Sequence, residues 1–286
     1  MSEETVGEPT PAQLRRGPFP LAGRTALVTG VSRRNGIGYA IARRLAALGA
    51  RLFLQHYSPH DQEQPWGAAP GGISAVRAGV ADVLVAGDVG PGGEALADLE
   101  LDLAADGAPE QLVRAATDAV GFVDILVCNH ARSGGDGPLG TLTAAMLDQH
   151  YAVNTRSSIL LAQAFAAQHD GRPGGRVIFM TSGQNLGPMT GEVAYAASKG
   201  ALAAITWTLA DQLADRGITL NTVNPGPVDT GWASGAAHEA VRRRFPGQQW
   251  GTPDDPARLI AWLTTDEAAW ITGQVINTEG GFRRGD

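Results

Sequence analysis

Cysteine is nearly absent from this sequence of 286 residues, which contains only Cys128. A single cysteine excludes a disulfide framework and a cysteine-based zinc site. The six histidines are scattered, and His238-Glu239 is not followed by the second histidine that a zinc-protease helix requires. We therefore expect no bound metal.

The sequence also lacks an excess of positive charge. It has 22 Lys and Arg against 29 Asp and Glu, a net charge of −7 and a pI near 5.4. General nucleic-acid binding needs a basic face, so we expect no nucleic-acid partner. No apolar run approaches the roughly 20 residues that span a bilayer. The opening MSEETVGEPTPAQ is acidic and has no apolar core of the signal-peptide kind. We expect no membrane contact and a soluble, cytoplasmic protein.

The composition does provide enough apolar material for a substantial core, with 43% hydrophobic and 18% charged residues. Residues 1–20 are rich in Pro, Glu, Thr and Gly, which predicts a disordered tail. Residues 21–286 contain no interior linker and no repeat, which indicates a single domain.

Short apolar runs alternate with helical patterns throughout this domain. The runs predict strands at 24–29, 50–55, 99–103, 123–128, 177–180, 218–223 and 274–278. Helices are predicted at 36–48, 109–120, 142–168, from about Tyr195 to Arg216, and at 256–263. Such alternation predicts an α/β fold, a Rossmann-type doubly wound parallel sheet with helices on both faces. Residues 58–98 are less clear, since 58–72 resembles a loop and 73–85 fits a helix, a strand or both.

Ser182, Tyr195 and Lys199 form the most suggestive group of side chains. Ser182 follows a buried strand, and the other two are four positions apart, so both lie on one face of a helix. A phenol normally titrates near ~10. A nearby ammonium favours phenolate, so we expect Lys199 to lower the pKa of Tyr195. Ser182 can then hydrogen-bond the oxygen whose charge changes.

Residues of the same kind follow several other predicted strands. Gly30, Asp102, Asn129, Ser182 and Pro225 each stand where a strand ends. In open α/β sheets, ligands bind beyond the carboxyl ends of the strands. This shared position favours a binding site over a chance pairing of Tyr and Lys.

The first such turn, TGVSRRNGIG, lies between a strand and a helix N-terminus, where a pyrophosphate binds well. Its glycines do not fit GxGxxG, and a tight structural loop is the alternative. Enzymes that prefer NAD usually place an acid after the second strand. Here that strand ends in QHY, while Arg33 and Arg34 in the turn can pair with a 2′-phosphate. This favours NADP(H), unless both arginines are simply solvated.

These features, in this order, resemble the short-chain dehydrogenase/reductase family, in particular its 3-oxoacyl-[acyl-carrier-protein] reductase-like members. The match covers about residues 22–282. Its pieces are ThrGly…GlyIleGly at 29–38, AspLeu at 102–103, AsnHisAla at 129–131, Asn154, Ser182, Tyr195-x3-Lys199, ProGly at 225–226 and a terminal TGQVINTEGG.

The resemblance implies four catalytic residues. Tyr195 would be the general acid/base and Ser182 would orient the carbonyl. Lys199 would bind the nicotinamide ribose and lower the pKa of the tyrosine, and Asn154 would hold a water in the proton relay.

It also implies a set of cofactor contacts. Asp102 and Leu103 would border the adenine, Val228 and Thr230 would contact the carboxamide, and Asn129 would steady the sheet. The full expected set is Gly30, Ser32, Arg33, Arg34, Gly36, Ile37, Asp102, Leu103, Asn129, His130, Tyr195, Lys199, Pro225, Gly226, Val228 and Thr230.

Three departures from the family pattern matter. The glycine turn is two residues longer than TGxxxGxG and matches in length the turn of enoyl-acyl-carrier-protein reductases. Those enzymes place six residues between Tyr and Lys, whereas three stand here, and Glu192 occupies the position of the more distant tyrosine. The usual NNAG reads CNHA, which makes His130 a packing histidine more readily than a functional one. Glu279 replaces an Asp, a change we expect to be mild.

The expected activity is therefore NADP(H)-dependent interconversion of a carbonyl and a secondary alcohol, with a 3-oxoacyl thioester as the leading substrate. An enoyl-thioester reductase and a non-catalytic nucleotide-sensing protein are the alternatives. Residues 231–251 are expected to form a substrate lid carrying Trp232, Phe245 and Trp250. Arg242, Arg243 and Arg244 are either a phosphate-binding group or, more simply, a solvated helix face. Helices 142–168 and 196–214 have apolar faces suited to a homodimer or homotetramer.

Overall fold

Parallel strands form the centre of the protein. The computed structural model describes residues 14–15, 17–85, 89–90 and 92–284, so most of the predicted tail at 1–20 lies outside the described residues. Within these ranges one seven-stranded sheet has the order β3-β2-β1-β4-β5-β6-β7. Its strands are β1 (Thr25–Val28), β2 (Arg51–His56), β3 (Leu96–Glu100), β4 (Ile125–Cys128), β5 (Gly175–Met180), β6 (Ile218–Asn224) and β7 (Val275–Asn277).

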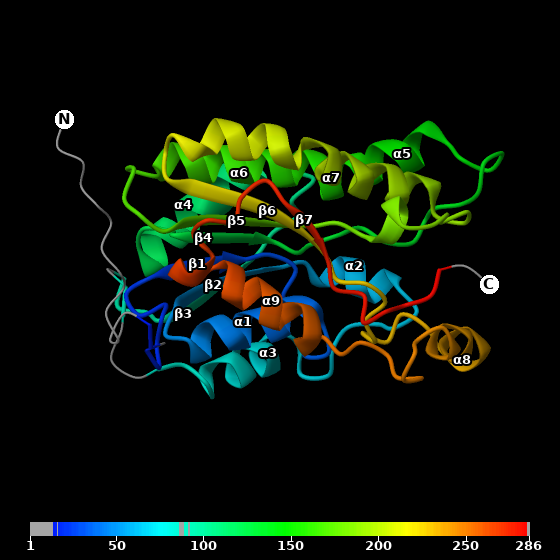
Figure 1. Cartoon of the computed structure of the whole chain (residues 1–286), viewed down its shortest axis with the longest axis horizontal. Coiled ribbons are helices and arrows are strands. Elements are labelled where there is room, and N and C mark those ends of the chain that lie inside the picture. Colours follow the sequence, from blue (N-terminus) through cyan, green and yellow to red (C-terminus); the bar gives the residue numbers. More distant parts are fainter. Residues whose placement is uncertain (1–13, 16, 86–88, 91, 285–286) are drawn as a thin grey trace.

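Helices cover both faces of the sheet (Figure 1). One face carries α1 (Ile37–Ala47), α3 (Gly72–Ala81) and α9 (Asp254–Leu263), and the other carries α4 (Ala108–Val120), α6 (Ser157–Gln168) and α7 (Val193–Ala214). Strand side chains alternate between the two layers. Ala26 and Val28 belong to the first core, whereas Leu27 belongs to the second. The α/β Rossmann-type prediction is confirmed.

The strand order reverses between β1 and β4, and this reversal positions the site. The chain moves outward from β1 to β2 and β3, then returns to place β4 on the other side of β1. Connections leaving these neighbouring strands diverge to opposite faces, which opens a crevice at their carboxyl ends. Gly30 and Asn129 therefore come together across this point.

The segment 58–98 contains two helices. Ser58–Glu63 forms the short helix α2, with Pro59 in its first turn, where a loop was predicted, and Gly72–Ala81 forms α3, in line with the helical alternative for 73–85. Strand β3 begins at Leu96, so Asp102 and Leu103 follow the strand instead of ending it. Residues 86–88 and 91 lie outside the described residues.

Two other predicted segments are more structured than expected. The helix expected at 142–168 is continuous but contains a π-helical turn, η1 (Tyr151–Arg156), between α5 (Ala144–His150) and α6. The segment 231–251 contains α8 (Gly235–Arg243). Short 3-10 turns occur at η2 (Gly183–Asn185) and η3 (Asp266–Ala268).

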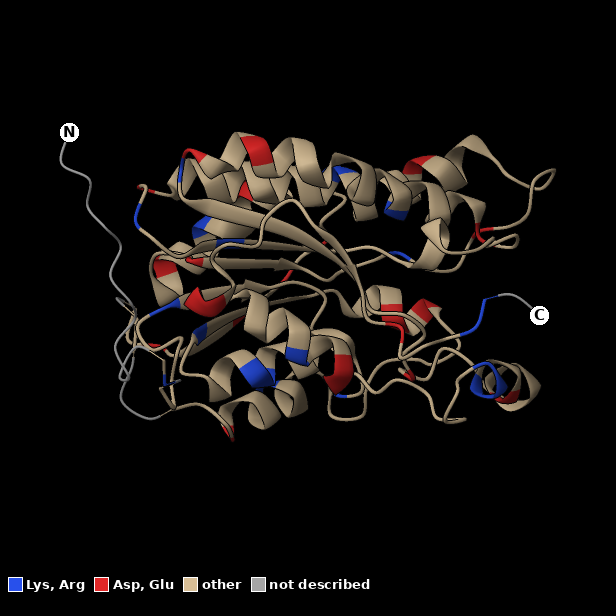
Figure 2. Ribbon diagram, in the orientation of Figure 1, with Lys and Arg blue, Asp and Glu red and all other residues tan. Residues whose placement is uncertain are grey.

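Charged residues of both signs are interspersed over the helices and loops, as Figure 2 shows. In the part of the chain that is described, none of the helices combines the length and apolarity needed to cross a membrane.

Candidate functional site

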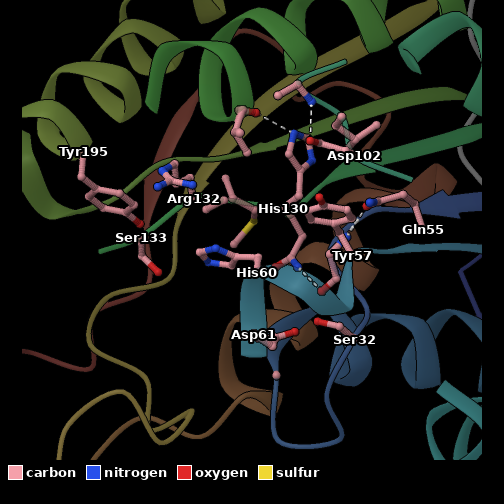
Figure 3. A pocket seen from close by; sticks show the side chains of 18 of the residues that line it. Ser32, Gln55, Tyr57, His60, Asp61, Asp102, His130, Arg132, Ser133 and Tyr195 are labelled. Carbon is pink, nitrogen blue, oxygen red and sulfur yellow. Dashed lines mark hydrogen bonds between the residues drawn. The ribbon is translucent and has the colours of Figure 1, made fainter. Parts of the chain in front are cut away.

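A cavity of about 680 Å³ opens at the carboxyl edge of the sheet. This volume is in the usual range for a cofactor or small-molecule pocket. Side chains from widely separated parts of the chain converge on it (Figure 3). Of the residues predicted as cofactor contacts, the lining includes Gly30, Ser32, Arg33, Gly36, Ile37, Asp102, Leu103, Asn129, His130, Tyr195, Lys199, Pro225 and Thr230.

Five predicted site residues do not line the cavity. Arg34 lines a separate hollow with Tyr39 and Arg43, and Gly226 and Val228 line neither of the two. Asn154 and Ser182 reach the site through neighbours, as described below.

The glycine turn is shaped for close approach. Gly30 has φ +70, and a Cβ there would lie 2.8 Å from the Cα of His130. The Gly30 N–H donates to Gln55 Oε1 at 2.9 Å. Asn129 Nδ2 donates to the carbonyls of Thr29 and Gly30, each at 3.1 Å, which ties the turn to β4. A fixed turn in front of the α1 N-terminus fits a phosphate-bearing cofactor.

His130 is held by hydrogen bonds at both ring nitrogens. Nδ1 contacts Thr29 Oγ1 at 2.6 Å, and Nε2 lies 2.7 Å from Ser157 Oγ and 3.0 Å from the Val153 carbonyl. Burial, reinforced by Lys199, lowers its pKa to about 3. A neutral, fully bonded ring agrees with the interpretation as a packing histidine.

Tyr195 and Ser182 meet through their hydroxyl groups. Burial, with repulsion from the Glu192 carboxylate, raises the pKa of Tyr195 to about 12, and the hydrogen bond with Ser182 opposes this rise. The phenol is therefore protonated at neutral pH.

Lys199 is 2% exposed and donates from Nζ to the Met180 carbonyl at 2.9 Å. Its Nζ is 5.9 Å from the centre of the Tyr195 ring, and burial lowers its pKa to about 8. In this structure burial and the Glu192 carboxylate dominate the pKa of the phenol, and the Lys199 ammonium donates to a carbonyl. A lowering of the Tyr195 pKa by Lys199 stays a prediction.

Asn154 lies on the π-helical turn and is fully buried. Its Oδ1 accepts from the Arg132 N–H at 2.6 Å, and its Nδ2 donates to the Arg132 carbonyl at 3.2 Å and to Ser198 Oγ at 2.8 Å. Both amide hydrogens are thus engaged by protein atoms. The side chain connects η1, the loop after β4 and α7, and π-helical turns often occur at such functional positions.

Asp136 was missed by the sequence analysis. Its carboxylate accepts hydrogen bonds from the backbone N–H of Ala194 at 3.0 Å and of Tyr195 at 2.7 Å. Burial would raise its pKa, but these bonds and the one from Gly137 lower it. A loop after β4 thereby caps α7 at the turn that carries Tyr195. No sequence signal gives such a contact across 59 positions.

Asp61 is the second missed residue. It stands on α2, beyond the strand end where the sequence predicted no acid, and its Oδ1 lies 3.1 Å from Arg33 Nε and accepts from Trp66 Nε1 at 3.0 Å. Arg33 also donates to the Thr230 carbonyl at 3.0 Å and lies over the Trp66 ring. Burial lowers the pKa of Arg33 and Asp61 opposes this. Arg33 is therefore a half-buried group paired with Asp61, not a solvated one.

The aromatic residues expected to face the substrate contact one another. Trp232 and Trp250 pack edge to face at 5.4 Å, Phe245 lies 6.4 Å from Trp250, and His238 stacks on Trp250 at 4.6 Å. None of them lines the cavity. Arg242 and Arg243 both pair with Glu239, as expected for a solvated helix face.

Comparisons with known proteins agree with this geometry. A family model described as Enoyl-(Acyl carrier protein) reductase matches residues 85–283. The oxidoreductase YjdA of Bacillus subtilis is 40% identical over 264 residues, covering 92% of this chain and 98% of that protein. A 3-oxoacyl-[acyl-carrier-protein] reductase of Synechocystis is 31% identical, with 92% and 98% covered. A short chain dehydrogenase from Burkholderia cenocepacia, solved in complex with NADP, is 36% identical with a TM-score of 0.76, covering 92% of this chain and 98% of that one.

Proposed function

Since this chain belongs to the short-chain dehydrogenase/reductase family and is an NAD(P)-dependent oxidoreductase, we propose that it interconverts a carbonyl and a secondary alcohol with NADP(H). The observation that carries the proposal is the placement of Tyr195 and Lys199 together on the wall of the cavity below the glycine turn, with Ser182 next to the phenol. Each of these three side chains has a distinct task in such chemistry.

The cofactor, when bound, supplies or accepts a hydride. Gly30, Ser32, Gly36 and Ile37 would hold its phosphates, and Pro225 and Thr230 would face its other end. Tyr195 keeps its proton at neutral pH and delivers it from Oη to the carbonyl oxygen of the substrate. A phenol with a raised pKa suits this acid role in the direction of reduction.

Ser182 donates or accepts a hydrogen bond at Tyr195 Oη, and the same hydroxyl would orient the carbonyl. Lys199 would bind the ribose from its position at the cavity wall. Asn154 would contribute to the proton relay by fixing the Arg132 backbone and Ser198 rather than by side-chain N–H groups, which are occupied.

NADP(H) is proposed over NAD(H). Arg33 lines the cavity, and the Burkholderia relative was solved with NADP. Arg34 faces the neighbouring hollow, so we assign the 2′-phosphate to Arg33 alone. Because Asp61 pairs with the same guanidinium, it competes with the 2′-phosphate and determines how strongly NADP(H) is preferred over NAD(H).

A 3-oxoacyl thioester is the leading substrate, because the Synechocystis relative carries that activity in its name. The family described as enoyl reductase keeps C=C reduction as a second candidate. The three residues between Tyr195 and Lys199, with Glu192 in place of a second tyrosine, favour the carbonyl. We further propose that residues 231–251 close on the substrate and that the protein is a homo-oligomer. A cytoplasmic location stays a prediction.

The test is NADPH oxidation by the purified chain with a panel of ketones, acetoacetyl-CoA and crotonyl-CoA. Tyr195→Phe is expected to reduce ketone turnover by about 10²- to 10⁴-fold, the usual contribution of a positioned acid. The Tyr195→Phe variant should still bind NADPH, as measured by the fluorescence of the nucleotide. The same measurement with NADH tests the preference for NADP(H). Tyr151→Phe, a matched change at a tyrosine that is 51% exposed, should leave turnover unchanged.

Two outcomes would contradict the proposal. A Tyr195→Phe variant that keeps most of its activity would remove Tyr195 as the acid. A parent protein that binds NADPH but reduces none of these compounds would favour the nucleotide-sensing alternative.

A further inference from the structure

Arg132 is a cavity residue that the proposed reaction does not use. It follows the β4 turn, lines the cavity, and its Nε is buried without a hydrogen-bond partner. The hydrogen bonds of Arg132 in the described part of the chain are those of its backbone, and none joins its guanidinium to a protein acceptor. A buried donor without an acceptor costs free energy, so a guanidinium that is left without a protein partner is suited to an external acceptor at its terminal N–H groups.

The other cations of the cavity wall are engaged. Arg33 pairs with Asp61, Lys199 donates to the Met180 carbonyl, and Arg156 donates to the Ala104 carbonyl at 2.5 Å. Arg132 therefore differs from its neighbours by offering its donors to the cavity instead of to the protein.

The backbone of Arg132 is fixed on both sides. Its N–H and its carbonyl are both bonded to the side chain of Asn154, which is fully buried. The following loop rests against Gln64, the residue that follows α2, since a Cβ at Gly134 would lie 2.6 Å from Gln64 Oε1. A fixed backbone restricts the positions that the side chain can occupy, which lowers the cost of ordering it on a ligand.

The guanidinium lies toward the reacting end of the cavity. In Figure 3 it projects between the rings of Tyr195 and His60, near Ser133, whereas Asp61 and Ser32 mark the opposite side. The charge of Arg132 acts on other groups of the cavity: burial and Arg132 lower the pKa of His60, and Asp61 opposes this lowering. Arg132 is therefore placed to attract an anion at this end of the cavity.

We propose that Arg132 is a specificity-determining residue that binds a carboxylate or phosphate on the carbonyl substrate. The planar guanidinium provides two parallel donors for such a group, a geometry that lysine does not reproduce. The proposal rests on the proposed function, since it assigns the substrate class of the same site: carbonyl compounds that carry an anion a few bonds from the reacting carbon.

The first experiment compares acetoacetate with its neutral counterpart, methyl acetoacetate, in NADPH-dependent reduction by the full chain. Loss of a charge-assisted pair is worth about 10- to 100-fold. Arg132→Leu should lower kcat/KM for acetoacetate by that factor, mainly through KM, and leave the ester within about twofold. Arg132→Lys should recover part of the loss. An unchanged preference for acid over ester in Arg132→Leu would overturn the proposal.

The second experiment needs no turnover. Calorimetric titration of butanoate into the protein with NADP⁺ should show binding to the parent and at least tenfold weaker binding to Arg132→Leu. Arg114→Leu, at an exposed position on α4, is the matched control and should bind as the parent does. Equal butanoate affinity in the parent and in Arg132→Leu would refute the assignment even if no ketone is reduced.

The same variants show whether Arg132 binds the anionic group of the substrate or the phosphate of the cofactor. If Arg132→Leu weakens NADPH binding tenfold, leaves NADH binding intact and keeps the acid-to-ester preference, the guanidinium serves the cofactor phosphate and the substrate proposal fails. If the parent reduces neither acetoacetate nor methyl acetoacetate while butanoate still binds through Arg132, the proposed function fails and the anion site stands.

Discussion

Lys199 is the single lysine of the whole sequence, and it is placed in the cavity at 2% exposure. Burial lowers its pKa to about 8 from the ordinary value of 10.5. Between these two values the unfolded chain binds the proton and the folded chain does not. Folding stability therefore rises with pH across this window, because the penalty for burying the charge disappears.

Relative to Lys199→Met, we expect the free energy of unfolding of the parent to increase by roughly 2 kcal/mol between pH 7 and pH 10, given about 1.4 kcal/mol for each pKa unit. From about pH 9 two other buried groups oppose this rise in both proteins, because burial raises the pKa of Cys128 and raises that of Tyr195 to about 12, so the unfolded chain loses those protons first. Urea unfolding at several pH values measures the slope. Lys199→Met should lack the rise and lose stability above about pH 9 through Cys128, and no other lysine can mask the difference from the parent. A parallel slope in the variant would show that Lys199 is not the titrating group.

At the scale of single residues, the sequence predicted positions better than environments. The placement of Tyr195 and Lys199 on one wall of the cavity could be predicted from their spacing, because helical period is a local property. The direction of the Tyr195 pKa could not, since it depends on burial and on Glu192. Asp61 was missed because its distance to Arg33 is set by how α2 packs, not by its position along the chain.

Helix α7 shows how an element can depend on a residue outside it. The helix begins at Val193 after Glu192, whose side chain makes no capping hydrogen bond. Asp136 supplies the missing acceptors for the N–H groups of Ala194 and Tyr195. Its negative charge is also favourable at a helix N-terminus.

Asp136→Ala is expected to lower stability by about 1–2 kcal/mol, the usual effect of losing a cap. It should also lower kcat by about tenfold with little change in NADPH affinity, because displacing Tyr195 by a fraction of an ångström harms proton transfer more than cofactor contact. Denaturant unfolding and steady-state kinetics measure both effects. Asp136→Asn keeps one acceptor and should be intermediate.

The matched control is Thr143→Ala, which removes the cap that Thr143 Oγ1 provides to α5 through Met146 N at 3.3 Å. It should cost similar stability without the loss of kcat. If both variants reduce kcat equally, Asp136 acts only through stability.

The strands and helices with a clear hydrophobic pattern could be predicted from the sequence, whereas the helices that follow β2 could not. Strands such as β5 carry buried apolar runs, and α1 and α4 have clear helical periodicity. Helix α3 is short and glycine-containing. It is held by contact with α1, where Gly79 leaves room for the Tyr39 hydroxyl 1.9 Å from where a Cβ would stand. Such helices depend on tertiary packing that local propensity does not reveal.

At the scale of the whole molecule, β7 forms one edge of the sheet. Among the described residues it pairs only with β6, and its Val275 is 38% exposed. Trp270 is 99% exposed, and Trp207, at 67%, lies over Gly273 just before the strand. An edge strand with neighbouring exposed indole rings is unfavourable in water and is normally covered. A second copy of the chain would cover it, in line with the proposed homo-oligomer.

Replacing both indoles, Trp207→Ser with Trp270→Ser, is therefore expected to dissociate the protein. Large aromatic residues at an interface centre contribute about 2 kcal/mol or more each, so the dimer dissociation constant should rise by at least tenfold. Light scattering coupled to size-exclusion chromatography over a range of concentrations measures the shift.

The control is Leu139→Ser, which removes a side chain that is 88% exposed elsewhere on the surface and should not alter the mass of the oligomer. A parent protein that is monomeric at every concentration would exclude this edge as an interface between copies. If the double substitution leaves the oligomer intact, the interface lies elsewhere, and Leu147 and Tyr151, the exposed apolar residues of α5 and η1, are the next positions to test.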